Sequence, residues 1–252
     1  MTIPDRPMIE IYGPPLAPPV DYARWTLDRM GMSYRMVPAA AVVSALRSSR
    51  MKVPIEPPLM LHGRNPVGGF RTSYALLHDA INADAQHPLP APDPEFAEDL
   101  FATLFTQAVR CFYREMLAYP MLLKPMSTMG VPAWHRWAVK GGYPIWRTIL
   151  AKGIKLDTTD AATDNASMTA AFDRVAVRLG DSPFLAGETP GADDILFAVM
   201  ASPVILPTAH PVAMPDVQSL PFAFRSIVER YRALPAGALA QRAYAHRHAA
   251  PA

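Results

Sequence analysis

Short apolar runs alternate with helical periodicity over the first third of the chain. Residues 8–12 (MIEIY) form a β-prone run, and the proline-rich GPPLAPP that follows predicts an extended turn. Beyond this turn, apolar residues recur at helical spacing from Val20 to Met30, with polar residues between them. Gly31 stands where such a helix would end. The pattern therefore predicts a strand followed by a helix.

The same alternation continues to about residue 83. A strand, a short helix and two more strands are predicted over residues 34–37, 41–50, 59–63 and 67–70. Thr72 or Ser73 is a suitable N-cap for a further helix that runs to about Ala83. The resulting order, βαβα and then ββα, predicts an α/β thioredoxin-like domain.

A change in composition marks the end of this domain. Residues 84–94 (DAQHPLPAPDP) are polar, proline-rich and without periodicity, which is typical of a stiff linker. Beyond them, residues 95–118 predict a long amphipathic helix, and the apolar spacings that follow Phe172 and Phe224 are helical. We therefore expect a thioredoxin-like domain over 1–84, a linker over 85–94 and an all-helical domain over 95–252.

Composition argues against several classes of function. The 24 basic and 22 acidic residues nearly cancel, and no run is basic enough to follow a nucleic-acid backbone. The single cysteine, Cys111, excludes an internal disulfide framework, and the seven histidines show no metal-ligand spacing. The N-terminus lacks the features of a signal peptide, and the most apolar window, residues 195–206, is too short to span a bilayer. We expect a cytoplasmic protein with no metal, nucleic-acid or membrane partner.

Three stretches, in their order and spacing, resemble the glutathione S-transferase superfamily, in a divergent bacterial form. IYGPPLAPPVDYARWTLDRMGMSY is similar to the family's opening strand, active-site turn and first helix, and the catalytic serine position falls on Ala17. PPLMLHGRNPVGGFRTSYALLHDAI is similar to the cis-proline hairpin and third helix, with Pro58, or as a variant Pro57, as the cis residue. FLAGETPGADDILFAV resembles the folding motif of the family's helical domain. The resemblance implies the glutathione transferase fold.

In the third stretch, the family's Ser or Thr helix cap is replaced by Gly191. We expect the Asp194 side chain to reach back to this cap, as in a capping box. A glycine cap costs only a few tenths of a kcal/mol relative to serine, so the fold should survive the change.

The resemblance also assigns a glutathione site. It implies contacts with the tripeptide at Pro57, Pro58, Leu59, Thr72, Ser73 and Lys52, and a second-substrate pocket at Leu16, Cys111 and Trp134. Pro57 has no N–H for the cysteinyl unit of glutathione, and Thr72 lacks the carboxylate that would meet its α-amino group. Ser73 keeps a hydroxyl and a helix-start N–H for the α-carboxylate. The predicted site is therefore only half retained.

The chemistry of a transferase needs a donor for the glutathione thiolate. A free thiol has a pKa of about 8.5, so only a small fraction is ionised at neutral pH without such a donor. Ala17 has no hydroxyl, which leaves Tyr12 and the backbone N–H groups at the start of the first helix. Pro18 and Pro19 remove two of those N–H groups.

Each candidate also has a structural interpretation. Ser73 could be a plain helix cap, Tyr12 a packed strand residue and Cys111 a buried, inert thiol. The aromatic residues Trp134, Trp137, Tyr143 and Trp146 could line an apolar pocket or pack in a core.

Two functions follow. The first is a homodimeric enzyme that joins the glutathione thiol to a small apolar electrophile or uses that thiol catalytically. The second is a non-catalytic member of the fold that binds another ligand or a protein partner, because Ala17, Pro57 and Thr72 all depart from the family pattern.

Overall fold

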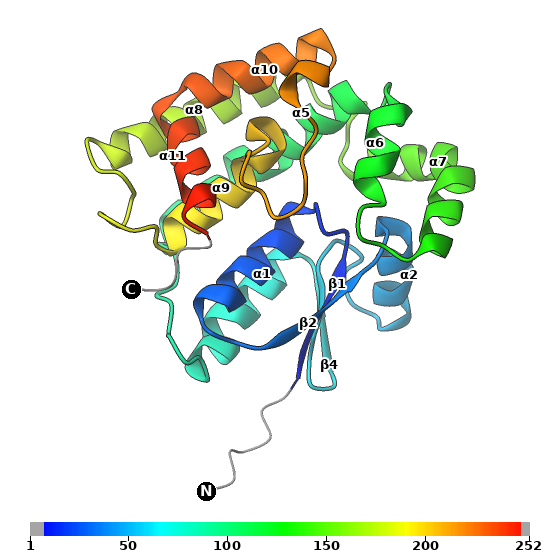
Figure 1. The fold of residues 1–252 in the computed structure, drawn as a ribbon, viewed down its shortest axis with the longest axis horizontal. Coiled ribbons are helices and arrows are strands. Elements are labelled where there is room, and N and C mark those ends of the chain that lie inside the picture. Colours follow the sequence, from blue (N-terminus) through cyan, green and yellow to red (C-terminus); the bar gives the residue numbers. More distant parts are fainter. Residues whose placement is uncertain (1–7, 248–252) are drawn as a thin grey trace, which may run out of the picture. The chain divides into compact units, whose positions relative to one another are not determined.

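The computed structural model describes residues 8–247, apart from the side chains of Arg136, Ala138 and Lys140. The outermost residues of both predicted domains, and His248 among them, lie outside this range. The chain forms two compact units (Figure 1). The first contains the chain up to Leu89 together with Ser127–Lys140, and the second contains Pro90–Met126 and the chain from Gly141 onward. The division after Leu89 falls inside the predicted linker.

The first unit is built on a mixed four-stranded sheet. Its strands are β1 (Ile9–Gly13), β2 (Tyr34–Pro38), β3 (Leu59–His62) and β4 (Asn65–Gly68), in the order β2-β1-β3-β4. Strand β1 pairs in parallel with β2 and antiparallel with β3, and β3 and β4 form an antiparallel hairpin. This confirms the predicted thioredoxin-like topology.

Alternate residues of β1 face different helices. A Cβ atom on Gly13 would lie 2.7 Å from Val20 of α1 (Pro18–Arg29), so this face of the sheet is covered by α1. Tyr12 points the other way, and Arg47 of α2 (Ala41–Arg50) lies over its ring at 3.9 Å. Helix α3 (Phe70–Leu76) packs beside α1 and continues as a π-helical turn over Leu77–Ile81.

The start of α3 differs from the prediction. Its N-cap is Gly69, and neither Thr72 nor Ser73 caps it. Gly69 has a φ of +89°, a conformation that favours glycine, and its N–H lies within hydrogen-bonding distance of the Glu56 and Pro58 carbonyls. These contacts with a distant segment fix the helix start, so Ser73 lies one full turn inside the helix.

Ser127–Lys140, which includes the first turns of α7 (Ala133–Gly153), joins the first unit, which the sequence did not indicate. The Ala40 N–H donates to His135 Nδ1 over 3.2 Å, and His135 is buried. A Cβ on Gly130 would lie 3.7 Å from Pro15, so the segment also lies against the turn after β1.

The regular secondary structure among the described residues of the second unit is helical, apart from an isolated bridge between Phe184 and Gly187. Its helices are α4 (Pro94–Leu100), α5 (Thr106–Met116), α6 (Pro120–Ser127), the later part of α7, α8 (Ala161–Leu179), α9 (Ala192–Ile205), α10 (Phe222–Ala233) and α11 (Pro235–Ala245). A π-helical turn, Phe101–Phe105, joins α4 to α5, and a short 3₁₀ turn, Val217–Ser219, precedes α10. Helix α9 is buried at every position except Asp193, because neighbouring helices surround it. The all-α prediction is confirmed.

The predicted capping motif of α9 is also present. Gly191 is the N-cap, and the buried Asp194 carboxylate accepts from its N–H over 2.9 Å. The same carboxylate accepts from the N–H groups of Leu185 at 2.7 Å and Ala186 at 3.3 Å. Asp194 thus joins the preceding loop to the helix.

No helix among the described residues combines the length and the apolar character that crossing a membrane would require.

Candidate functional site

The predicted site begins at the turn between β1 and α1. Ala17 is the N-cap of α1 and has an extended backbone, and Pro18 and Pro19 are the first two helical residues. The N–H groups of Val20 and Asp21 both donate to the Ala17 carbonyl, at 2.9 and 3.0 Å. Residues 17–21, all described by the structure, therefore present neither a hydroxyl nor a free N–H at this helix start.

Tyr12 lies on the opposite face of the sheet from this turn. Its hydroxyl donates to Glu10 and accepts from Arg47 over 3.0 Å. Burial, followed by the Glu10 hydrogen bond, raises the pKa of Tyr12 above its usual value. Tyr12 is 3% exposed and packs on α2, which matches the structural interpretation of this residue.

The peptide bond between Pro57 and Pro58 is cis, so Pro58 is the cis-proline that the resemblance implies. A Cβ on Gly13 would lie 3.6 Å from the Pro57 Cβ, which puts the cis-proline beside the end of β1. Leu59 follows in β3, fully buried, with Tyr12 and Gly68 as its partners in the sheet.

Ser73 and Thr72 differ in their hydrogen bonds. The Ser73 N–H donates to the Gly69 carbonyl over 3.1 Å, which corrects the expectation of a free helix-start N–H. Its hydroxyl is buried and has no hydrogen-bond partner among the described residues. The Thr72 hydroxyl donates to the Gly68 and Gly69 carbonyls, which secures the glycine turn before the helix.

A carboxylate that sequence reasoning missed lies near the start of α3. The Glu56 Oε2 atom is 3.7 Å from the position that a Cβ on Gly69 would occupy. Glu56 is exposed and stands two residues before the cis-proline, which is the one sequence signal that could have pointed to it. Lys52 is also exposed and adopts a left-handed backbone conformation, with a φ of 59°.

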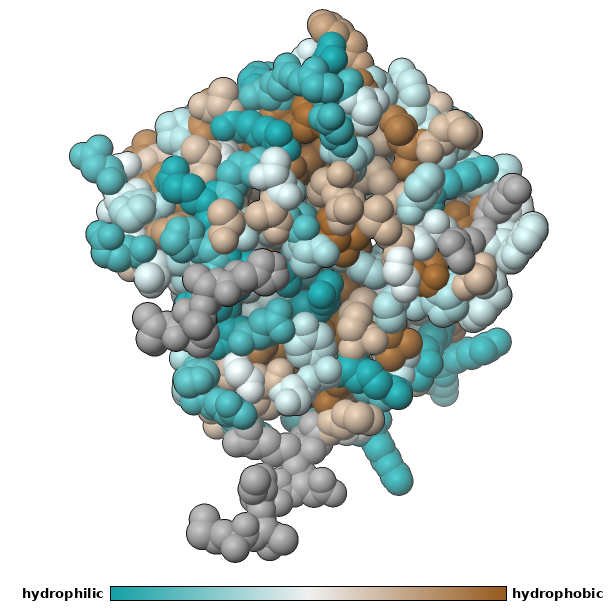
Figure 2. Space-filling view, viewed as in Figure 1, coloured by the Kyte–Doolittle hydropathy of each residue, from teal (hydrophilic) through white to brown (hydrophobic). Residues whose placement is uncertain are grey.

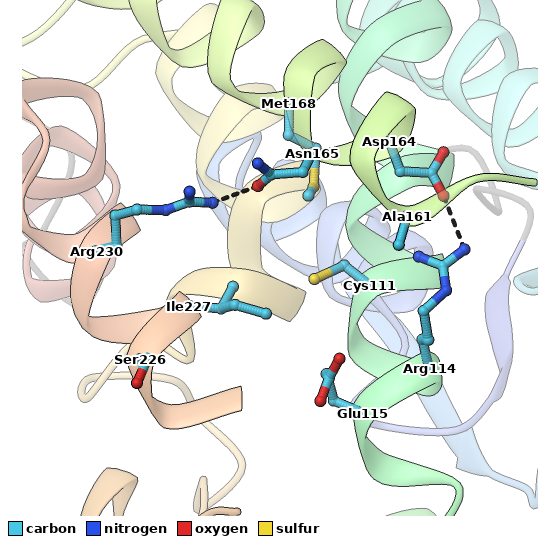
Figure 3. Close-up of a pocket in the computed structure, with 10 residues that line it drawn as sticks. All are labelled: Cys111, Arg114, Glu115, Ala161, Asp164, Asn165, Met168, Ser226, Ile227 and Arg230. Carbon is cyan, nitrogen blue, oxygen red and sulfur yellow. Dashed lines mark hydrogen bonds and ion pairs between the residues drawn. The ribbon is translucent and has the colours of Figure 1, made fainter. Parts of the chain in front are cut away.

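The residues predicted for a second-substrate pocket fall in both units. Leu16 is half-buried and Trp134 is 60% exposed, both in the first unit. Cys111 belongs to the second unit, where it lines a cavity of about 300 Å³ between α5, α8 and α10. Figure 3 shows its sulfur directed toward α10.

The cavity around Cys111 has apolar and charged walls. Met168 and Ile227 are apolar, whereas Arg114 and Arg230 carry charge. Burial raises the pKa of the Cys111 thiol to about 12, so the thiolate is not available at neutral pH. The described residues contain no cluster of three or more His, Cys, Asp or Glu that could hold a metal ion.

Solved structures resemble this chain over nearly its whole length. Glutathione transferase F2 from Populus trichocarpa aligns with a TM-score of 0.56 and 13% identity, over 95% of this chain and 94% of its own. Glutathione transferase GSTFuA3 from Phanerochaete chrysosporium aligns with a TM-score of 0.58 and 12% identity, over 98% of this chain and all of its own. The chain has the glutathione transferase fold.

The likeness is one of architecture. A glutathione S-transferase of Ceriporiopsis subvermispora, in complex with glutathione, aligns with a TM-score of 0.53 and 13% identity, over 96% of this chain and 98% of its own. No protein-family profile matches the chain, and no curated protein matches it. At this identity the glutathione transferase fold is established, and the function rests on the site itself.

Proposed function

We propose that this protein is a ligand-binding member of the glutathione transferase fold, which holds a glutathione-like ligand without ionising its thiol. One observation carries the proposal, namely that the helix start at Ala17 has no donor. A helix N-terminus stabilises an anion through its free N–H groups, and the first turn of α1 has none to offer.

The other candidate donor is also unsuited to the task. The Tyr12 hydroxyl donates its proton to Glu10 and lies on the α2 face of the sheet. A tyrosine that activates a thiol would have to donate to the sulfur instead. Without a donor, a bound thiol should keep a pKa near its free value of about 8.5.

The proposal that a glutathione-like ligand binds here rests on Ser73. A buried hydroxyl without a partner costs about 1–3 kcal/mol, which a ligand acceptor would recover. Ser73 lies in α3, which begins directly after Gly69 and the cis-proline segment. A carboxylate beside Ser73 would accept a hydrogen bond from this hydroxyl.

A conjugating enzyme is the second candidate. The cis Pro58 and the buried Ser73 hydroxyl are both features that the family uses for glutathione, and the fungal protein noted above is solved in complex with it. This candidate requires a thiol donor from outside residues 17–21.

Calorimetric titration with glutathione and with S-methylglutathione tests binding. We expect both ligands to bind with similar affinity, because no interaction depends on a thiolate. Ser73→Ala should weaken both about tenfold, which corresponds to the loss of one charge-assisted hydrogen bond. Ser44→Ala is the matched control, because the Ser44 hydroxyl is also buried and has no hydrogen-bond partner in the described part of the chain, but lies on α2. Absence of saturable binding at millimolar ligand would rule out the proposal that the protein binds a glutathione-like ligand.

We also propose that the protein forms a homodimer, which the fold likeness supports. The domain and linker bounds at 1–84, 85–94 and 95–252 stay a prediction, beside the compact unit that Ser127–Lys140 forms with the first part of the chain. Sedimentation equilibrium measures the assembly directly. A monomer at all accessible concentrations would contradict it.

A further inference from the structure

The cavity around Cys111 lies wholly within the helical unit. It has a volume of about 300 Å³, and all of its lining residues come from α5, α8 and α10. Pockets that bind small molecules begin at about this volume, so the cavity suits a small ligand. It needs no residue of the first unit, unlike the second-substrate pocket that the sequence predicted with Leu16 and Trp134.

The floor of this cavity is apolar. Met168 of α8 is 1% exposed, Cys111 of α5 is buried and Ile227 of α10 is half-buried. Because burial raises the pKa of the Cys111 thiol to about 12, the thiol stays neutral and contributes an apolar surface. Figure 3 shows the Cys111 sulfur and Ile227 next to each other. A ligand on this floor would need an apolar body.

Arg230 of α10 supplies a cation on one side of the floor. No carboxylate pairs with it among the described residues, where its hydrogen bond goes to the Asn165 amide oxygen. The Arg230 guanidinium also lies over the Tyr231 ring at 4.7 Å. A guanidinium has five N–H donors, so Arg230 keeps donors for an anion.

Asn165 of α8 adds a second donor at the same place. Its Oδ1 accepts from Arg230 and lies 3.0 Å from the Tyr231 hydroxyl. These two donors fix the oxygen on their side, so the other end of the amide is the NH₂ group. That NH₂ group donates to no acceptor in the described part of the chain. A carboxylate beside Arg230 would therefore accept from both residues.

Glu115 of α5 supplies the opposite charge. Its carboxylate is half-buried and forms no ion pair within the described residues. The adjacent Arg114 does not face it, because neighbouring residues on a helix point in different directions. Arg114 instead donates to Asp164 at 3.2 Å. Figure 3 shows Glu115 on α5 and Arg230 on α10, with Cys111 and Ile227 between them. Glu115 is therefore available to an ammonium group.

The charges around the cavity balance. Two basic and two acidic side chains line it, namely Arg114, Arg230, Glu115 and Asp164. The charged residues next in sequence to the lining also balance, namely Arg110, Arg225, Asp160 and Glu229. Where Figure 1 labels α10, Figure 2 shows mainly hydrophilic side chains with hydrophobic ones between them. A ligand without net charge fits this balance better than a polyanion or a polycation.

We propose that this cavity binds a small zwitterion, whose ammonium and carboxylate stand at the two ends of a short apolar body. The carboxylate accepts from Arg230 and Asn165, and the ammonium donates to Glu115. The apolar body lies on the floor between them. The ω-amino carboxylic acids have this chemistry. The proposal is independent of the glutathione-like ligand, because it uses no residue near Ser73.

Calorimetric titration of the full chain tests the proposal with four probes. The first, 6-aminohexanoate, carries both charges and an apolar body. Hexanoate lacks the ammonium, hexylamine lacks the carboxylate, and glycine lacks the body. We expect 6-aminohexanoate to bind about tenfold more tightly than each of the others, because each of them loses one of the three contacts.

Variants assign the two charged contacts. Glu115→Gln should weaken 6-aminohexanoate about tenfold and leave hexanoate unchanged, because hexanoate has no ammonium. Arg230→Met should weaken both about tenfold and leave hexylamine unchanged. Glu229→Gln and Arg225→Met are the matched controls, since these charges of α10 do not line the cavity, and neither should change any affinity.

Three results would overturn the proposal. The first is an absence of saturable binding of 6-aminohexanoate at millimolar concentration. The second is equal affinity for 6-aminohexanoate, hexanoate and hexylamine. The third is a loss of hexanoate binding in Glu115→Gln as large as the loss of 6-aminohexanoate binding, which would indicate general damage to the cavity. Ser73→Ala should leave 6-aminohexanoate binding unchanged, so failure here is distinct from failure at the site near Ser73.

Discussion

At the scale of single residues, the cap of α9 shows how neighbours can reverse an intrinsic preference. Serine is a better N-cap than glycine in general. At Gly191, however, a Cβ would lie 2.6 Å from the Ala186 Cβ, which is too close for two carbon atoms. Glycine is therefore the residue that fits this turn.

We predict that Gly191→Ser lowers the free energy of unfolding by roughly 1–3 kcal/mol, as for other overpacked sites. Chemical denaturation measures the change. The double variant Ala186→Gly with Gly191→Ser should recover most of the loss, because the contact is removed. A single variant more stable than the parent would show that the loop moves away freely.

The Asp194 carboxylate should matter more than the cap itself. Asp194→Ala removes the buried acceptor of three backbone N–H groups, so we expect a loss of about 1–3 kcal/mol in unfolding free energy. Asp194→Asn keeps one oxygen acceptor and should lose less. Equal losses in the two variants would mean that these hydrogen bonds are not the cause.

Cys111 should behave as an inert thiol. It is 7% exposed, and burial raises its pKa to about 12. We expect a thiol reagent such as Ellman's reagent to react with the folded protein far more slowly than with free cysteine. The rate should rise in step with unfolding as denaturant is added. Fast reaction of the folded protein at neutral pH would contradict this account.

At the scale of elements, a buried histidine joins α1 to the π-helical turn after α3. The Tyr22 hydroxyl and His78 Nε2 lie 2.7 Å apart, and burial lowers the pKa of His78 to about 4 from 6.5. The unfolded chain therefore binds a proton between these pH values that the folded chain does not. The stabilisation is fully present above pH 6.5 and is lost as the pH falls toward 4.

We predict that unfolding free energy, measured by denaturation at several pH values, falls by up to about 3 kcal/mol across this window on account of His78. His78→Gln, which can still bond Tyr22 but does not titrate, should lose that part of the pH dependence. If the variant and the parent show the same slope, His78 is not its source.

Helices and strands were predictable where the sequence pattern that determines them lies within a few neighbouring residues. The apolar spacing around α1 and the alternating runs of the sheet lie within a few residues, and residues 41–50 form the predicted helix without change. The N-cap of α3 was not predictable, because Gly69 is fixed by carbonyls of Glu56 and Pro58. The association of residues 127–140 with the first unit depends on a contact between Ala40 and His135, far apart in sequence.

At the scale of the whole molecule, the fold is that of glutathione transferases, and the helix start at Ala17 carries no hydroxyl or free N–H. The topology, the cis-proline and the α9 motif were all visible in the sequence, because backbone geometry depends on few side chains. The partners of Tyr12 and of the Val20 and Asp21 N–H groups were not visible, because they depend on three-dimensional contacts.

Restoring a donor should restore reactivity if a thiol lies at the start of α1. We predict that Ala17→Ser raises the rate of glutathione conjugation with an aromatic electrophile at least tenfold above that of the unaltered protein, since a well-placed oxyanion donor is worth about 10²–10³-fold. Ala17→Gly, which fits the cap but adds no hydroxyl, should leave the rate unchanged. No gain with Ser, despite tight glutathione binding, would place the thiol elsewhere.

The central claim is that the helix start at Ala17 cannot ionise a thiol, and the rate of the unaltered protein tests it most directly. The measurement compares conjugation of glutathione to a generic aromatic electrophile at neutral pH, with and without the protein. We predict equal rates at every glutathione concentration. A rate that rises above the uncatalysed reaction and saturates with glutathione would contradict the account.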